Sequence, residues 1–323
     1  HVIRVADDGD GMTPEDVELA VARHATSKLR SSTDLFDIAT LGFRGEALAS
    51  MAAVSRLTIE SRHADEDAGS RLIIEGGIRR TFETIGRSRG TTVQVRNIFF
   101  NTPARRKFLR RVDTELRHTT QVVSQLSAAY PEVGFELSHG ERTIVSMHAG
   151  SPAQRAAELL TSNSEQLIEV TVDSDELSVR GFLNRPDHCG RSKSKQFIVV
   201  GGRPVFARSL NQAVYRAYAG LHPKEIQPAF LIWLSVQPRS VDMNVHPSKR
   251  EVRIDKEWEL AECLERAVRD ALTDANNGQG PAGRTVALTD RSRSDEADFQ
   301  HYQTVRGFPG DQVSDDGSTQ LDL

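Results

Sequence analysis

The first residues constrain the fold more than any other part of the chain. His1–Ala6 alternate in polarity as a β-strand does, and the turn Asp7-Asp8-Gly9-Asp10-Gly11 follows directly. Thr13 is suited to cap a helix and Pro14 to be its first residue. A strand that leads into a helix through a glycine-rich turn predicts a sheet with a helix packed on it. Because the chain starts inside this strand and not with methionine, we expect residues upstream of His1 to be missing.

The remaining pattern predicts a mixed fold. Strands are expected at residues 57–61, 71–75, 91–96, 135–138, 142–147, 168–172, 177–183, 196–200, 230–236 and 251–254. Helices are expected from Gly45 onward and at residues 114–129, 153–160, 209–218 and 256–271. Strands and helices do not alternate regularly, which favours the α+β class. We predict domains at 1–149 and 150–273, and a disordered linker at 274–323, where Gly, Ser, Asp and Gln dominate.

Composition excludes several classes of protein. The longest apolar run, Ala229–Leu234, is too short to cross a bilayer, so a membrane protein is not expected. The chain has 2 cysteines, Cys189 and Cys263, in no metal-binding spacing, which argues against a zinc site or a disulfide scaffold. No signal-peptide pattern opens the sequence. These features predict a protein of the reducing cytosol.

Charge is unevenly distributed along the chain. The net charge of −4 equals the surplus in residues 276–323, which hold eight acidic and four basic residues. Six basic residues lie between Arg185 and Arg208 with a single acid, Asp187. A second basic cluster comprises Arg105, Arg106, Lys107, Arg110 and Arg111. Such clusters are either solvated faces or binding surfaces for an anionic partner.

The turn at residues 7–11 allows two interpretations. A calcium loop is rejected, because the alignment puts Val17 where a bidentate Glu is required. The turn is then either a simple strand-to-helix connection or a place where a flat ligand approaches the backbone and a carboxylate accepts its hydrogen bond.

A second glycine-bounded turn, at residues 41–50, opens a helix and suits a phosphate. The chain contains no GxxxxGK[ST] sequence, no dinucleotide-binding GxGxxG after a strand and no GxSxG sequence. The histidines show no metal-binding spacing, and we interpret them as structural. A phosphate site without a P-loop restricts the possible classes considerably.

Four segments together resemble the MutL family of DNA mismatch-repair ATPases, within the GHKL superfamily: Arg23-His24-Ala25-Thr26-Ser27-Lys28, Gly42–Leu48, Asn101–Leu109, and Val245-His246-Pro247 with Lys249. The resemblance covers roughly residues 1–273. It implies a GHKL (Bergerat-type) α/β sandwich over 1–149 and a transducer domain like the second domain of ribosomal protein S5 over 150–273. In one departure, Gly201-Gly202-Arg203 replaces the family's usual Asn-Gly-Arg.

The resemblance also implies site residues. The ATP-binding set would be Asp7, Gly9, Gly11, Thr26, Ser27, Gly42, Phe43, Arg44, Gly45, Leu48 and Thr91. Asp7 would accept the adenine amino group, and Lys249 would reach the γ-phosphate as the catalytic cation. Arg203 and Arg208 would contact DNA backbone phosphates without base specificity. The cofactors would be ATP and Mg²⁺.

The implied function is an ATP-gated, dimerising clamp that binds DNA and couples mismatch recognition by MutS to a downstream repair nuclease or helicase. The expected location is the bacterial cytosol, at the nucleoid. Gln320-Leu321-Asp322-Leu323 is similar to the start of a sliding-clamp-binding peptide. The family's general base and magnesium ligand lie upstream of the position of Asp7, so no metal ligand is expected in this chain and its hydrolysis is expected to be poor. Two alternatives stay open: a nucleotide-sensing DNA scaffold without productive hydrolysis, and another GHKL enzyme such as a topoisomerase ATPase subunit.

Overall fold

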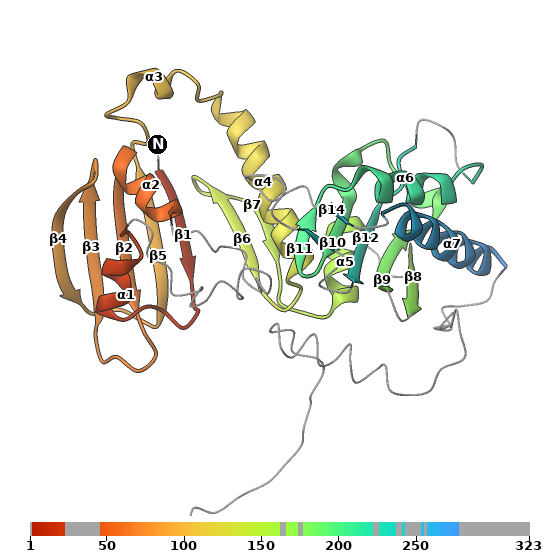
Figure 1. Cartoon of the computed structure of the whole chain (residues 1–323), viewed down its shortest axis with the longest axis horizontal. Coiled ribbons are helices and arrows are strands. Elements are labelled where there is room, and N and C mark those ends of the chain that lie inside the picture. Colours follow the sequence, from red (N-terminus) through yellow and green to blue (C-terminus); the bar gives the residue numbers. More distant parts are fainter. Residues whose placement is uncertain are drawn as a thin grey trace, which may run out of the picture. The chain divides into compact units, whose positions relative to one another are not determined.

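The computed structural model of the chain describes residues 2–22, 46–161, 166–173, 177–221, 226–236, 241–242, 253–254 and 257–277. The chain divides into two compact units, which we call unit 1 (His1–Val112) and unit 2 (Asp113–Leu323), and each is described by itself. Both combine helices with sheets, which confirms the α+β class (Figure 1).

Unit 1 is built on a five-stranded antiparallel sheet in the order β1-β5-β2-β3-β4. Its elements are β1 (Val2–Asp7), α1 (Pro14–Leu19), α2 (Ala47–Val54), β2 (Arg56–Arg62), β3 (Gly69–Glu75), β4 (Ile78–Ile85), β5 (Gly90–Arg96) and α3 (Pro103–Arg106). The predicted cap of α1 is confirmed, since the Thr13 hydroxyl accepts a hydrogen bond from the Asp16 amide and Pro14 opens the helix.

The core of unit 1 lies between the sheet and its two longer helices. Helices α1 and α2 lie against the sheet in Figure 1. Alternate residues of β2, such as Leu57 and Ile59, are buried on one face and pack with Val17 of α1 and Ala52 of α2. Strand β4 was not predicted from the sequence. Most of its side chains are exposed or half-buried, so it lacks the alternation of a strand with one buried face.

Unit 2 contains a second five-stranded sheet in the order β11-β10-β12-β9-β8, in which only β10 and β12 are parallel neighbours among the described strands. Its helices and strands are α4 (Val112–Ala129, which starts at the last residue of unit 1), β6 (Phe135–His139), β7 (Arg142–Met147), α5 (Pro152–Leu160), β8 (Leu167–Asp173), β9 (Leu177–Asn184), β10 (Gln196–Val200), β11 (Arg203–Val205), α6 (Arg208–Ala217), β12 (Phe230–Val236), β13 (Val241–Asp242), β14 (Arg253–Ile254) and α7 (Glu257–Asn276). Two short 3₁₀ turns cover Pro186–His188 and Lys193–Lys195.

The sheet of unit 2 is covered on both faces (Figure 1). On one face α6 and α7 pack against side chains such as Ile232, and on the other face α4 and α5 pack against side chains such as Leu231. This explains the apolar run at 229–234, because a central strand with two covered faces needs apolar residues at consecutive positions. Strands β11 and β13 were not predicted: β11 has three residues and includes Pro204, which suits an edge strand. Helix α7 continues five residues beyond its predicted end at Ala271.

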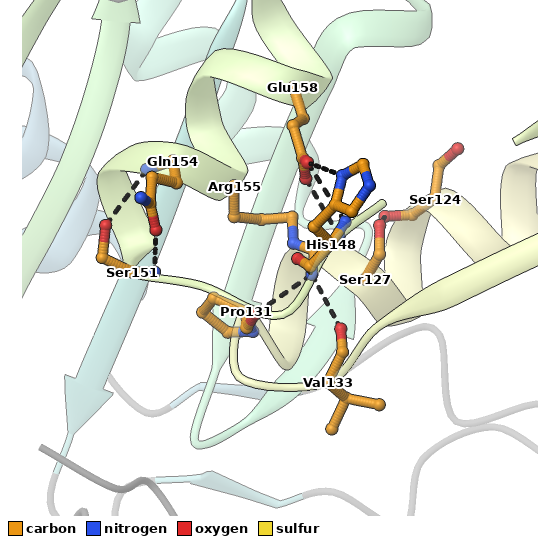
Figure 2. Close-up of polar contacts among 9 residues, drawn as sticks. All are labelled: Ser124, Ser127, Pro131, Val133, His148, Ser151, Gln154, Arg155 and Glu158. Atoms are coloured by element: carbon orange, nitrogen blue, oxygen red, sulfur yellow. Dashed lines mark hydrogen bonds and ion pairs between the residues drawn. The ribbon is translucent and has the colours of Figure 1, made fainter. Parts of the chain in front are cut away.

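A buried arginine of α5 joins two loops of unit 2, the one after α4 and the one after β7. The Arg155 side chain is 1% exposed, and its Nη2 atom lies 3.0, 2.7 and 2.7 Å from the carbonyl oxygens of Pro131, Val133 and His148 (Figure 2). Nη1 forms an ion pair with Glu158 at 3.4 Å. Burial lowers the pKa of the Arg155 guanidinium, an effect that the charge of Glu158 opposes. One side chain therefore fixes the turn after α4 and the end of β7 to the first turns of α5.

The first turn of α5 also has a complete capping box. The Ser151 hydroxyl accepts from the Gln154 amide, and the Gln154 side chain accepts from the Ser151 amide (Figure 2). At the C-terminal end of α4, the Trp233 indole donates to the Ala128 carbonyl at 3.0 Å and meets the Phe182 ring edge-on, with centroids 6.2 Å apart. Both helices contribute buried residues to the core on the same face of the sheet.

Candidate functional site

The end of β1 and the start of β5 meet at Asp7. Asp7 pairs with Thr91 across the two strands, and its Oδ1 atom accepts hydrogen bonds from the Gly9 and Thr91 amides, both at 3.1 Å. The structure thus brings together three residues that the sequence assigned to one ligand. Two N–H donors at Oδ1 fix the carboxylate. No described residue donates to Oδ2, which can therefore accept from an outside donor. This arrangement suits a ligand that carries an N–H group.

Ser61, at the end of β2, supports the same place. It is fully buried, and its Oγ atom accepts from the Met12 amide at 2.8 Å, lies 2.9 Å from Thr91 Oγ1 and donates to the Gly90 carbonyl at 3.2 Å. Ser61 was not predicted from the sequence to belong to the site. The sequence did carry a signal for it. Side chains alternate between the two faces of a strand, so Ser61 lies on the same face of β2 as Leu57 and Ile59, where an apolar core residue is expected.

Two glycines at this site are required by the protein's own backbone. Gly11 has a φ of +76°, and a Cβ there would lie 1.9 Å from the Arg62 carbonyl oxygen. Gly90 has a φ of +111°, and a Cβ would lie 2.1 Å from the Asp7 carbonyl oxygen. Any larger residue would therefore push apart the strand ends that position Asp7 and Thr91. Glycine is required at position 11 by the Arg62 carbonyl oxygen of the protein itself, whether or not a ligand binds beside it.

An exposed arginine closes the turn at 7–11 from another loop. Arg89 donates to the Gly9 carbonyl at 3.0 Å and to Asp10 Oδ1 at 2.7 Å. Both side chains are largely exposed, so we expect the ion pair to contribute less than about 1 kcal/mol. Arg89 was also missed, and the sequence carries no signal for it, since the contact spans about eighty residues.

The other predicted nucleotide-site residues are placed only in part. Leu48 lies in α2, half-buried and packed against the core of unit 1. Thr26, Ser27, Gly42, Phe43, Arg44, Gly45 and Lys249 lie outside the described residues. Within the part of the chain that is described, no group of three or more His, Cys, Asp or Glu side chains could hold a metal ion.

The two arginines predicted to contact DNA differ in exposure. Arg203 lies in the edge strand β11 and is only 5% exposed, whereas Arg208 is an exposed residue at the start of α6. Among the described carboxylates none pairs with Arg208. A cation at a helix N-terminus opposes the helix dipole, so the fold gains nothing from this charge locally. Arg208 is thus the one of the two whose charge is open to an anionic partner.

None of the described helices is long and apolar enough to cross a membrane. Residues 1–85 match the family described as "Histidine kinase-, DNA gyrase B-, and HSP90-like ATPase", and residues 156–273 match "DNA mismatch repair protein, C-terminal domain". Asp7, Gly9, Gly11 and Ser61 fall within the first match, Thr91 lies beyond its end, and Arg208 falls within the second.

Several proteins of similar sequence are named MutL. The "DNA mismatch repair protein MutL" of Anaeromyxobacter sp. (strain K) is 42% identical over 276 residues, 85% of this chain and 46% of that protein. MutL of Syntrophobacter fumaroxidans (strain DSM 10017 / MPOB) is 40% identical over 303 residues, 93% of this chain and 45% of that protein. The chain thus spans about half the length of the curated relatives it matches.

Solved structures agree with the fold. A structure of the Aquifex aeolicus MutL ATPase domain complexed with ADP has a TM-score of 0.54 and 26% identity, and the match covers 73% of this chain and 80% of that one. A crystal structure of the N-terminal domain of a DNA repair protein has a TM-score of 0.69 at 23% identity, over 85% and 86% of the two chains. The matches with MutL proteins favour the mismatch-repair family over a topoisomerase ATPase subunit. The chain belongs to the MutL family of DNA mismatch-repair proteins, with a GHKL-type ATPase domain followed by a domain of the S5-like kind.

Proposed function

We propose that unit 1 binds ATP at the Asp7 site. The observation that carries this proposal is the double hydrogen bond to Asp7 Oδ1, which leaves Oδ2 to accept from an outside N–H donor such as the adenine amino group. Thr91, Gly9 and Gly11 frame the same place, and the Ser61 hydrogen bonds hold it rigid. The ADP complex of the Aquifex aeolicus MutL domain supports a nucleotide of this class.

The phosphates are assigned to residues beyond the described ranges. Thr26, Ser27 and the amides of residues 42–45 would surround them, and Lys249 would bring a positive charge to the γ-phosphate. Mg²⁺ would accompany the phosphates and neutralise their charge. We assign no magnesium ligand among this chain's residues. We also propose that the protein hydrolyses ATP. Residues 1–149 would form the ATPase domain, residues 150–273 the transducer and DNA-binding domain, and residues 274–323 the linker that follows.

DNA binding is proposed for unit 2 through Arg208. An exposed guanidinium at the start of α6 can pair with a backbone phosphate on any sequence. Arg203 offers little of its side chain to a phosphate, so its part in the proposal is to support the edge strand that precedes Arg208. In the complete cycle, ATP binding drives pairing of two copies into a clamp on DNA, and the clamp passes the MutS signal to a nuclease or helicase. We also propose that residues 320–323 bind a sliding clamp.

The test is whether nucleotide controls DNA binding. Duplex affinity would be measured with and without a non-hydrolysable ATP analogue, on the 323-residue chain and on Asp7→Asn, with ATP turnover followed in parallel. We expect the analogue to tighten DNA binding in the parent chain alone. DNA affinity that neither the analogue nor Asp7→Asn changes would favour the nucleotide-independent scaffold. Absence of analogue binding would reject the Asp7 site itself.

A further inference from the structure

The five-stranded sheet of unit 2 has two edges that differ in how they are protected. At one edge, β11 has three residues and includes Pro204, which cannot donate a backbone hydrogen bond. At the other edge, β8 has seven residues without proline or lysine, and its register with β9 contains no bulge (Figure 1). Short length, proline, lysine and bulges are features that keep an edge strand from pairing with another chain. β8 has none of them.

The direction of the backbone groups of β8 follows from one hydrogen bond. The Arg185 amide donates to the Gln166 carbonyl at 3.1 Å, directly before the register pair of Leu167 with Asn184. Backbone groups of an antiparallel strand turn alternately to one side and the other, so those of the even-numbered residues of β8 turn to β9. The N–H and C=O groups that turn away from β9 belong to Leu167, Glu169, Thr171 and Asp173. Among the described strands, none pairs with β8 on this outer side.

The side chains of β8 do little to repel a second strand. Ile168, Val170 and Val172 are buried in the core to which α7 contributes. On the other face of the sheet, Glu169 forms an ion pair with Arg180 of β9, with 3.6 Å between Oε1 and Nε. The neighbouring cation offsets part of the Glu169 charge.

We propose that β8 pairs antiparallel with β8 of a second copy of this chain, about a twofold axis at Val170. In this register, Leu167 lies opposite the partner's Asp173, and Glu169 lies opposite the partner's Thr171. All of these residues turn their backbone groups to the outer edge, so each pair can exchange two hydrogen bonds. The two sheets would then form one continuous sheet.

The side chains on the α7 face also match in this register. Val170 lies opposite the partner's Val170, and Ile168 lies opposite the partner's Val172. Cross-strand pairs of β-branched side chains stabilise neighbouring strands.

Charge selects this register over its neighbours. An axis at Glu169 would put the two Glu169 carboxylates opposite each other, and an axis at Thr171 would put Glu169 opposite the partner's Asp173. Like charges directly opposite destabilise paired strands. An axis at Ile168 or Val172 would pair fewer of the outward-turned residues. β8 is therefore complementary to itself in one register, and this complementarity points to a second copy as the occupant of the edge.

The pairing goes beyond the clamp proposed above, because it uses an edge of unit 2 and needs no nucleotide. The experiment measures sedimentation velocity of the 323-residue chain without nucleotide, over a range of protein concentrations. Since one pair of strands makes a small interface, we expect a weak, reversible dimer.

Thr171→Glu and Thr171→Gln are the matched variants, since their side chains have nearly the same shape and differ in charge. Thr171→Glu puts a carboxylate opposite the partner's Glu169 in both halves of the interface, and we expect the dimer to weaken about tenfold. Higher salt should reduce this loss. Thr171→Gln should dimerise as the parent chain does.

Hydrogen exchange followed by NMR locates the interface within the dimer. The Glu169 and Thr171 amides turn to the outer edge, so their protection should rise with protein concentration. The Ile168 and Val170 amides turn to β9 and should be protected at every concentration, which makes them the internal control.

Other outcomes overturn the proposal. A chain that stays monomeric at all concentrations does so, as does equal dimerisation of Thr171→Glu and Thr171→Gln. Protection of the Glu169 and Thr171 amides that does not depend on concentration indicates that another segment of the same chain pairs with β8. A dimer that forms only with an ATP analogue belongs to the clamp and rejects this inference while leaving the proposed function in place.

Discussion

Asp7 Oδ1 and the Thr91 amide are joined by a 3.1 Å hydrogen bond between residues 84 positions apart in the sequence. Asp7 is the last residue of β1 and pairs with Thr91 of β5, so this bond adds a side-chain contact at the end of the two paired strands. The position of the carboxylate therefore depends on the register of β1 and β5. The carboxylate is therefore held at a fixed point at the end of the sheet.

Asp7→Asn should weaken nucleotide binding with little effect on stability. The two backbone N–H groups hold the amide with its oxygen inward, so the NH₂ group replaces Oδ2 and faces the adenine amino group, donor against donor. We expect a loss of about ten- to a hundredfold in ATP-analogue affinity, measured by calorimetric titration. Asp10→Asn, in the same turn, is the control and should bind as the parent does. Equal affinity in both variants would exclude Asp7 as the adenine acceptor.

Ser61→Ala should destabilise unit 1. The substitution leaves the Met12 amide without its acceptor and removes the contact with Thr91, at a fully buried position. The expected loss is about 1–3 kcal/mol, measured by differential scanning calorimetry. Ser88→Ala removes an exposed serine hydroxyl of the loop before β5 and should change the melting temperature little. A melting curve of Ser61→Ala that overlays the parent would contradict the role given to this hydroxyl.

Arg155→Met should destabilise unit 2 more strongly. Three carbonyl oxygens lie around Nη2, more than its two hydrogens can serve one to one, and the variant leaves them and Glu158 without the cation (Figure 2). We expect a loss of about 3–5 kcal/mol, seen as a lower urea midpoint by circular dichroism. Arg155→Lys should recover less than half of it, because an ammonium lacks the planar fork. Arg142→Met, at an exposed position of β7, is the control.

Glu265 should make stability depend on pH. The hydrogen bond from Arg216, together with Arg269, lowers the pKa of the Glu265 carboxyl. A lowered pKa in the folded state gives stability that is present above the unfolded value of about 4.5 and is lost as pH falls through the folded pKa. The melting temperature of Glu265→Gln should therefore be below the parent's at pH 6, and the gap should close towards pH 3. Glu262→Gln, whose carboxylate is more exposed, should show a smaller gap; a gap independent of pH would contradict the assignment.

Arg208→Glu should weaken duplex binding equally on unrelated sequences. A phosphate contact carries no base information, so the ranking of sequences should stay the same. The salt slope should fall by about 0.9, since one released counterion is lost. Filter binding at several salt concentrations measures both effects. If the slope is that of the parent chain, Arg208 does not contact phosphate.

Local chemistry made much of the fold predictable. The cap formed by Thr13 and Pro14 depends on adjacent residues, and the apolar run at 229–234 marks a covered strand by itself. β4 escaped prediction because its partners and not its own pattern make it a strand. The role of Arg155 was not predicted for a related reason. No residue near it in the sequence indicates that two of its carbonyl acceptors lie about twenty residues upstream.

The residues of the Asp7 site also differ in how far the sequence could predict them. Asp7, Gly9, Gly11 and Thr91 belong to short motifs with a recognisable family pattern, so the sequence could name them. Ser61 and Arg89 act through contacts that only the strand register creates. Burial separated Arg203 from Arg208, which look alike in the sequence but differ in exposure because one lies within an edge strand and the other at a helix start.

The placement of the two tryptophans has a consequence for how this molecule can be observed. Trp233 and Trp258 are the only tryptophans of the chain, and both lie in unit 2. Trp233 is held between α4 and the Phe182 ring, whereas Trp258 is open to solvent. Intrinsic emission should therefore have a shielded, blue-shifted part and a part that iodide quenches. Both parts report on unit 2, so unit 1 can unfold without a tryptophan of its own to signal it.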